Sequence, residues 1–179
     1  SPSYETIFEL MHKCKTQGGT LHCGSMSWVL TGCYLSVGLK ARQVVCLPKD
    51  STDFECHSTV AVYSDSKKKW LYMDPSNCIY VLNDKNEILS FSEFREHVII
   101  GKPIHLNKEQ NNNGFKLYEK FYLYDYMAKN LYAFQCFSNE EGNSTSNLLL
   151  PVEFKRVITR TRSSFPKITN NPDLFWKKP

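Results

Sequence analysis

The sequence has no hydrophobic run long enough to cross a membrane. A membrane-spanning helix needs about 18 or more consecutive apolar residues, and the nearest candidate, residues 28–39, is interrupted by a threonine, a serine and two glycines. The composition, 41% hydrophobic and 22% charged residues, is instead typical of a chain that folds around its own core. We therefore expect no membrane partner.

Residues 1–150 also lack an excess of either charge. They contain 15 Lys and Arg against 16 Asp and Glu, so the net charge of +4 comes from residues 151–179, which contain 7 against 2. A nucleic-acid-binding domain usually carries a basic face across its body, and nucleic acid is therefore not an expected partner. In a strand expected over residues 156–162, one face would carry Arg156, Ile158, Arg160 and Arg162. We interpret it as a charged sheet edge, with an anionic ligand or partner as the alternative.

The seven cysteines have no regular spacing and include no Cys-x-x-Cys pair. Free thiols in a reducing compartment are the simplest interpretation, which predicts a cytoplasmic protein. Three disulfides with one reactive thiol in a secreted protein remain the alternative. The start at Ser1 rather than Met is compatible with the loss of an upstream targeting segment.

Sequence patterns for cofactors are absent as well. His12, Cys14, His22 and Cys23 lack the paired spacing of a zinc site. No loop places several carboxylates at alternate positions as a calcium site needs, and there is no glycine-rich phosphate loop. The sequence therefore predicts neither a metal nor an organic cofactor.

Residues 26–37 carry the clearest periodic pattern of the chain. Apolar residues recur at positions 26, 29, 30, 33, 34 and 37, the spacing of one helical face. The pattern predicts a core helix with Cys23 in its first turn and Gly38 as the left-handed residue after its end. Cys33 and Cys46 are expected to be small core residues.

After this helix, residues 43–47, 56–63 and 69–74 are typical of strands, with a turn at residues 64–67. One buried helix followed by an antiparallel meander predicts the α+β class. We expect a catalytic core over residues 1–106, a linker over 107–114, and an aromatic-rich β segment over 115–179 that packs on the core in the same domain. Its aromatic cluster is expected to pack on the catalytic layer and comprises Tyr118, Phe121, Tyr122, Tyr124 and Tyr126.

Cys23, His57 and Asp74 are the residues that could support thiol chemistry. A helix start favours the thiolate form of Cys23, although a buried structural cysteine is the alternative. With a two-residue turn after Ser64, His57 lies directly opposite Asp74, with Cβ atoms about 5 Å apart. A loop that is two residues longer keeps both on one face as diagonal neighbours. In either register the aspartate can accept the imidazole N–H and hold its tautomer.

These residues occur within a pattern that resembles the transglutaminase-like superfamily. The resemblance covers Cys23-Gly24, residues 37–45 (Val-Gly-Leu-Lys-Ala-Arg-Gln-Val-Val), His57, and residues 70–76 (Trp-Leu-Tyr-Met-Asp-Pro-Ser). It implies the transglutaminase-like form of the cysteine-proteinase fold, with the cysteine helix packed on an antiparallel sheet. It also implies Cys23 as nucleophile, His57 as general base and acid, and Asp74 as the residue that orients the histidine. Ser58 departs from the family, many members of which have an aromatic residue there.

Four more residues are candidates for supporting roles. Gln17 resembles in its spacing the oxyanion glutamine of papain-like peptidases, with a solvent-facing turn as the alternative; the backbone N–H of Cys23 is the default oxyanion donor. Trp70 and Tyr72 share a strand face with Asp74, where they either line the site or pack in the core. Arg42 is expected to pair with a carboxylate.

The expected function is thiol-dependent acyl transfer or hydrolysis on a peptide or carboxamide bond of a protein or peptide substrate. Attack of water on the acyl-enzyme makes the chain a peptidase or amidase, which we favour, and attack of an amine makes it a transglutaminase. The alternative is a non-catalytic peptide-binding module that retains the fold. The sequence does not indicate an oligomeric state.

Overall fold

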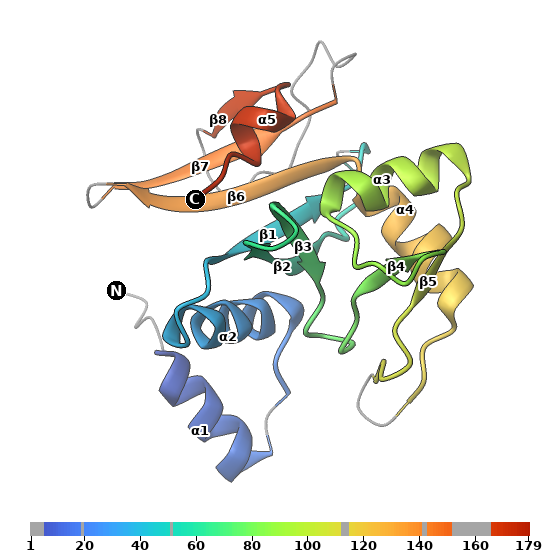
Figure 1. Ribbon diagram of the computed structural model, residues 1–179. Helices are drawn as coiled ribbons and strands as arrows, with labels where there is room; N and C mark the ends of the chain where they lie inside the picture. Colours follow the sequence, from blue (N-terminus) through green and yellow to red (C-terminus); the bar gives the residue numbers. More distant parts are fainter. Residues whose placement is uncertain (1–5, 19, 51, 112–114, 141–142, 152–165) are drawn as a thin grey trace.

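The computed structural model describes residues 6–18, 20–50, 52–111, 115–140, 143–151 and 166–179. Six strands form the central sheet, in the order β3-β2-β1-β6-β7-β8 (Figure 1). Their bounds are β1 Ala41–Leu47, β2 His57–Ser64, β3 Lys69–Met73, β6 Ala133–Glu140, β7 Asn143–Leu149 and β8 Lys167–Thr169. All neighbours are antiparallel except β7 and β8. The predicted α+β class is therefore confirmed.

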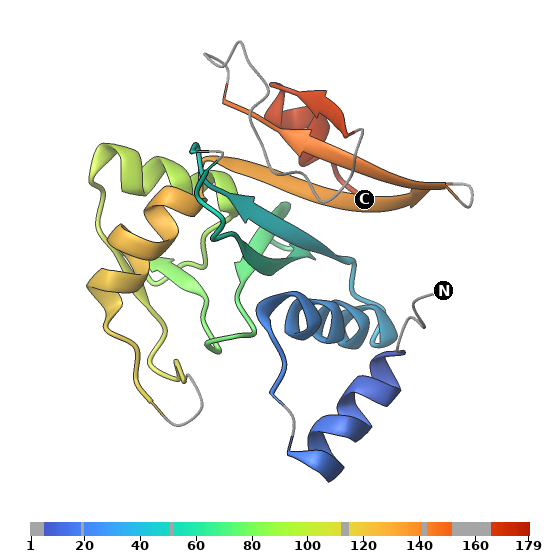
Figure 2. The same cartoon turned by 180° about the vertical axis from the view of Figure 1, so that it is seen from behind.

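Within the described residues, five α-helices and one π-helix accompany the sheet. They are α1 Ile7–Gln17, α2 Cys23–Ser36, α3 Phe91–Ile100, the π-helix η1 Phe121–Met127, α4 Ala128–Asn130 and α5 Pro172–Phe175. A small second sheet pairs β4 Val81–Asn83 with β5 Ile104–Leu106. Figures 1 and 2 show α1 and α2 together on one side of β1 and β2, away from α3, α4 and the small sheet. No helix in the described part of the chain is long and apolar enough to cross a lipid bilayer.

The main core lies between the sheet and the α3–η1 side of the molecule. Sheet residues Val44, Ala61 and Tyr72 pack there with Phe91 of α3 and Tyr122 of η1. Since residues alternate between the two faces of a strand, Gln43 of β1 points to the opposite face. There its amide donates to Gly24 O of α2 over 2.8 Å. The cysteine-bearing helix and the aromatic segment thus cover opposite faces of one sheet.

The ends of α2 agree with the prediction, whereas its buried face does not. Cys23 is the first residue of α2, and Gly38 follows its end with a φ of 81°. However, the buried residues are Gly24, Ser27 and Thr31, and the predicted core residue Cys33 is exposed. The small residues allow the helix backbone to approach the sheet closely. Polar Ser27 is satisfied there because its hydroxyl donates to Gly24 O over 3.0 Å.

The β2–β3 hairpin has the longer of the two loops considered. Ser64 pairs with Lys69 and Val60 with Met73, so four residues form the loop rather than two. Lys68 in this loop adopts a φ of 54°. Continuing the register by one residue puts Asp74 opposite Thr59, diagonal to His57. The direct opposition of His57 and Asp74 is therefore wrong, and their diagonal placement on one face is found.

The C-terminal segment contributes strands β6, β7 and β8 to the central sheet. β6 pairs directly with β1, and β7 and β8 extend the sheet from it. Asn107, where the linker was predicted to begin, is buried and donates to Cys78 O over 3.0 Å while accepting from Tyr80 N–H over 2.9 Å. Residues 112–114 of that linker lie outside the described residues, as do Arg156, Ile158, Arg160 and Arg162.

Arg42 pairs with aromatic rings instead of the predicted carboxylate. Its guanidinium lies 4.3 Å from the Trp70 ring and 5.0 Å from the Trp176 ring, and it donates to Phe175 O over 2.8 Å. Trp70 comes from β3, whereas Phe175 and Trp176 come from the C-terminal residues, which are remote in sequence.

Candidate active site

A cavity of about 610 Å³ opens beside the first turn of α2. Cys23 and His57 both line it, together with residues of the β3–β4 turn and of η1. Cys23 begins α2, His57 begins β2, and Asp74 directly follows β3. Three elements that meet at one end of the sheet therefore bring the three predicted residues together.

Cys23 is half-buried, and the pKa of its thiol is lowered by its surroundings. The hydrogen bond from the His57 imidazole is the largest influence on the Cys23 pKa and lowers it. Burial opposes this effect, while the backbone N–H and the hydroxyl of Ser58 lower the pKa further, to a final value of about 7. The helix start adds unpaired N–H groups that favour a thiolate. At neutral pH a large fraction of this thiol is therefore nucleophilic thiolate.

Ser58 replaces the aromatic residue that the resemblance leads one to expect. Its side chain is fully buried, and its hydroxyl has no nitrogen or oxygen partner among the described residues. Paired opposite Val45, it points to the sheet face that α2 covers. At this position the chain therefore carries a buried hydroxyl, which lowers the Cys23 pKa.

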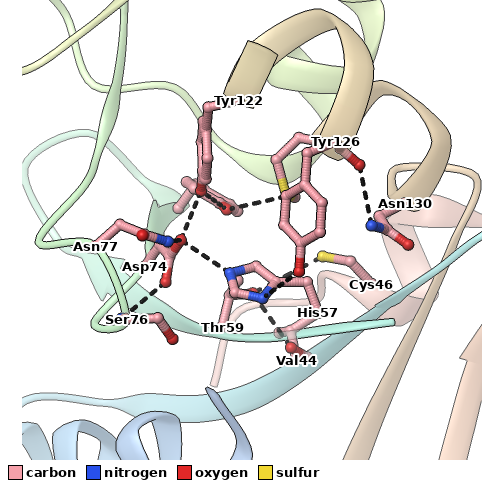
Figure 3. A network of polar contacts seen from close by, with 12 residues as sticks. Val44, Cys46, His57, Thr59, Asp74, Ser76, Asn77, Tyr122, Tyr126 and Asn130 are labelled. Carbon is pink, nitrogen blue, oxygen red and sulfur yellow. Dashed lines mark hydrogen bonds and ion pairs between the residues drawn. The ribbon is translucent and has the colours of Figure 1, made fainter. Parts of the chain in front are cut away.

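His57 and Asp74 form a buried pair. The distance between His57 Nε2 and Asp74 Oδ2 is 2.8 Å (Figure 3). Burial lowers the His57 pKa, but the charge and hydrogen bond of Asp74 and the contact with Cys23 outweigh it and raise the pKa to about 9. Because Nε2–H donates to the carboxylate, the ring nitrogen left for the thiol is Nδ1, which the Tyr126 hydroxyl also contacts.

Asp74 is held by three further donors. Its Oδ1 accepts from Ser76 N–H over 2.9 Å, and its Oδ2 accepts from Asn77 Nδ2 over 2.9 Å and from the Tyr122 hydroxyl over 2.7 Å. Burial raises the Asp74 pKa, but His57 and these hydrogen bonds outweigh it and lower the pKa. The carboxylate is thus both ionised and fixed in orientation.

Tyr126 contacts the other side of the imidazole. Its hydroxyl lies 3.2 Å from His57 Nδ1, and the two rings meet edge to face with their centroids 5.3 Å apart (Figure 3). Tyr122 and Tyr126 are four residues apart on η1, a type of helix often found at functional sites. Of the predicted aromatic cluster, Tyr122 and Tyr126 therefore pack on the layer of His57 and Asp74, whereas Tyr118, Phe121 and Tyr124 are exposed. No sequence pattern predicted that Tyr122 would contact Asp74 and Tyr126 would contact His57.

The other candidates lie outside the cavity. Gln17 is the exposed last residue of α1. Trp70 is buried in the core beside Arg42, and Tyr72 is fully buried, with its hydroxyl 2.7 Å from the Tyr122 hydroxyl. Tyr72 therefore contacts Asp74 only through Tyr122. The backbone N–H of Cys23, in the first turn of α2, remains the donor best placed for an oxyanion.

Replacing Tyr122 with phenylalanine is expected to lower the free energy of unfolding by about 1–3 kcal/mol. The substitution removes a buried hydroxyl that donates to the Asp74 carboxylate. Urea denaturation at pH 7 measures the change. Tyr124→Phe, which alters a half-exposed tyrosine of the same helix, serves as control and should change stability by less than about 0.5 kcal/mol. Equal stability of the two variants would contradict the importance of this bond.

Among the described residues, no group of three or more His, Cys, Asp and Glu side chains is arranged to hold a metal ion. Comparisons of the chain with protein-family models, curated proteins and solved structures find no match. The chemistry of the site is therefore inferred from the contacts of Cys23, His57 and Asp74.

Proposed function

We propose that the chain is a transglutaminase-like thiol enzyme that hydrolyses or transfers the acyl group of a peptide or carboxamide. One observation carries the proposal: a thiol with a pKa of about 7 contacts an imidazole that a buried carboxylate holds from its other side. This is the arrangement that activates a cysteine nucleophile. The sequence resemblance and the packing of α2 on the sheet agree with it.

In the proposed reaction, the Cys23 thiolate attacks the substrate carbonyl carbon and forms a C–S bond. The backbone N–H of Cys23 stabilises the oxyanion. The His57 imidazolium gives the Nδ1 proton to the leaving amine as the C–N bond breaks, which leaves a thioester. Asp74 keeps its hydrogen bond to Nε2 and stabilises the positive charge of His57.

The second half of the reaction releases the acyl group. His57, now neutral, takes a proton from water or from an amine, which attacks the thioester carbonyl and displaces the Cys23 thiolate. Water yields a carboxylic acid and makes the chain an amidase or peptidase, which we favour, whereas an amine yields a new amide. Turnover of a fluorogenic peptide amide with and without a primary amine separates the two outcomes. The proposed chemistry requires a reduced thiol and no cofactor.

Alkylation by iodoacetamide across pH tests the central observation. The Cys23 rate is expected to rise with a midpoint near pH 7, compared with about 8.5 for an ordinary cysteine. Turnover also needs the His57 imidazolium, so it should rise through pH 7 and fall above about pH 9. Replacing His57 with alanine should move the alkylation midpoint upward, because it removes the group that most lowers the Cys23 pKa. Mass spectrometry of proteolytic fragments assigns each rate to its cysteine.

Exposed Cys33 is the matched control within the same chain. It should react more slowly than Cys23 at pH 7 and be unaffected by His57→Ala. If Cys23 and Cys33 react equally fast at pH 7, the nucleophile assignment fails and the non-catalytic binding module becomes the better explanation.

A further inference from the structure

The lining of the cavity beside Cys23 is poor in charged side chains. Among the residues that the structure describes, no Lys, Arg, Asp or Glu lines it, although 22% of the chain is charged. The cation that faces it is His57, whose charge is paired with the buried Asp74 carboxylate, and the Cys23 thiolate is consumed when it bonds to the acyl group. A charged substrate group placed here would lose hydration without gaining a free counter-ion, which is costly.

Apolar side chains form two walls of this cavity. Leu21 precedes α2 and Met26 lies in its first turn, and Leu117 and Phe121 come from the C-terminal segment. The Phe121 side chain is 52% exposed, so an apolar group that covers this ring would remove further apolar surface from water. Burial of such surface is favourable in proportion to its area.

The position of Phe121 is tied to the orientation of the catalytic groups. Phe121 is the first residue of η1, which also carries Tyr122, bonded to Asp74, and Tyr126, in contact with His57. One short helix thus supports both buried groups and presents a side chain to the cavity. A substrate group that packs on Phe121 would lie in the same cavity as the reacting thiol.

We propose that this cavity selects an acyl donor whose side chain next to the reacting carbonyl is apolar and uncharged, and that Phe121 recognises that side chain. The inference rests on the proposed function, because it assigns the substrate class of the same site. Phe121 acts on specificity and not on ionisation of the thiol. A change at Phe121 should therefore alter which acyl donors react while the intrinsic reactivity of Cys23 is retained.

Three N-acetyl-aminoacyl chloromethyl ketones, with Phe, Glu and Lys side chains, test the selection. The Cys23 thiolate displaces chloride, so a C–S bond forms as the C–Cl bond breaks. We expect the second-order rate for the Phe reagent to exceed the rates for the Glu and Lys reagents by about tenfold or more. Division by the rate of each reagent with glutathione removes differences in intrinsic reactivity, and iodoacetamide measures the thiol itself.

Phe121→Ala should reduce the preference for the Phe reagent by about tenfold and leave the iodoacetamide rate unchanged. Phe121→Glu should favour the Lys reagent. Tyr124→Ala, which alters a residue of η1 outside the cavity lining, is the control and should keep the original preference. Equal normalised rates of the three reagents, or a preference that persists in Phe121→Ala, would overturn the inference. In that case, faster iodoacetamide labelling of Cys23 than of Cys33 would still support the proposed function. If Cys23 reacts with iodoacetamide no faster than Cys33, the proposed function fails and the inference fails with it.

Discussion

Replacing Asp74 with asparagine is expected to lower turnover of a peptide amide by roughly 10³- to 10⁴-fold, by analogy with the aspartate of serine-protease triads. The variant loses the charge that most raises the His57 pKa, so the imidazolium and the Cys23 thiolate are both disfavoured. The alkylation midpoint of Cys23 should therefore move upward. Steady-state kinetics and the pH profile of alkylation measure the two effects.

The hydrogen bonds of Asp74 explain why the isosteric amide of asparagine is not expected to replace the carboxylate, since both carboxylate oxygens accept hydrogen bonds. His57, Asn77 and Tyr122 converge on Oδ2, and Ser76 N–H points to Oδ1. An asparagine NH₂ at the Oδ2 position would donate to Nε2 and hold the wrong tautomer, while one at the Oδ1 position would oppose the Ser76 N–H.

Asp65→Asn, in the exposed loop after β2, removes the same charge away from the site and should leave both measurements unchanged. Full activity of the Asp74→Asn variant would show that the buried pair has no role in turnover.

Replacing Arg42 with alanine is expected to lower the free energy of unfolding by about 3 kcal/mol, from lost cation–π contacts and a lost charge-assisted hydrogen bond. The largely buried guanidinium lies over the rings of Trp70, Trp176 and Phe175 and donates to Phe175 O. Burial lowers the Arg42 pKa, yet an arginine remains charged at pH 7. Urea denaturation measures the loss.

Arg42→Lys keeps the charge without the planar group and should recover only part of the stability. Lys40→Ala is the control, because Lys40 is exposed and its side chain donates, over 3.4 Å, to Pro179 O at the C-terminus. A loss in Arg42→Ala no greater than in Lys40→Ala would mean that the C-terminal residues do not depend on this contact.

Several features could be predicted from the sequence because they depend on neighbouring residues. Apolar spacing and Gly38 identified α2 and its end, and alternating residues with a polar turn identified β2 and β3. The periodicity did not identify the buried face of α2, since Gly24, Ser27 and Thr31 face the sheet. An apolar stripe marks a face that avoids water, but the closest approach of a helix to a sheet is made by small side chains.

The sequence by itself determined the order of Cys23, His57 and Asp74 and the elements that carry them, because helix starts and strand alternation are local properties of the chain. Only the tertiary structure decided the β2–β3 register, the placement of Tyr122 and Tyr126 on Asp74 and His57, and the aromatic partners of Arg42. The register follows from the four-residue loop, which the turn residues left open. The tyrosine contacts and the bond from Arg42 to Phe175 join residues about 50 to more than 130 positions apart. No local pattern encodes them, because they depend on which faces of distant elements the packed core brings together.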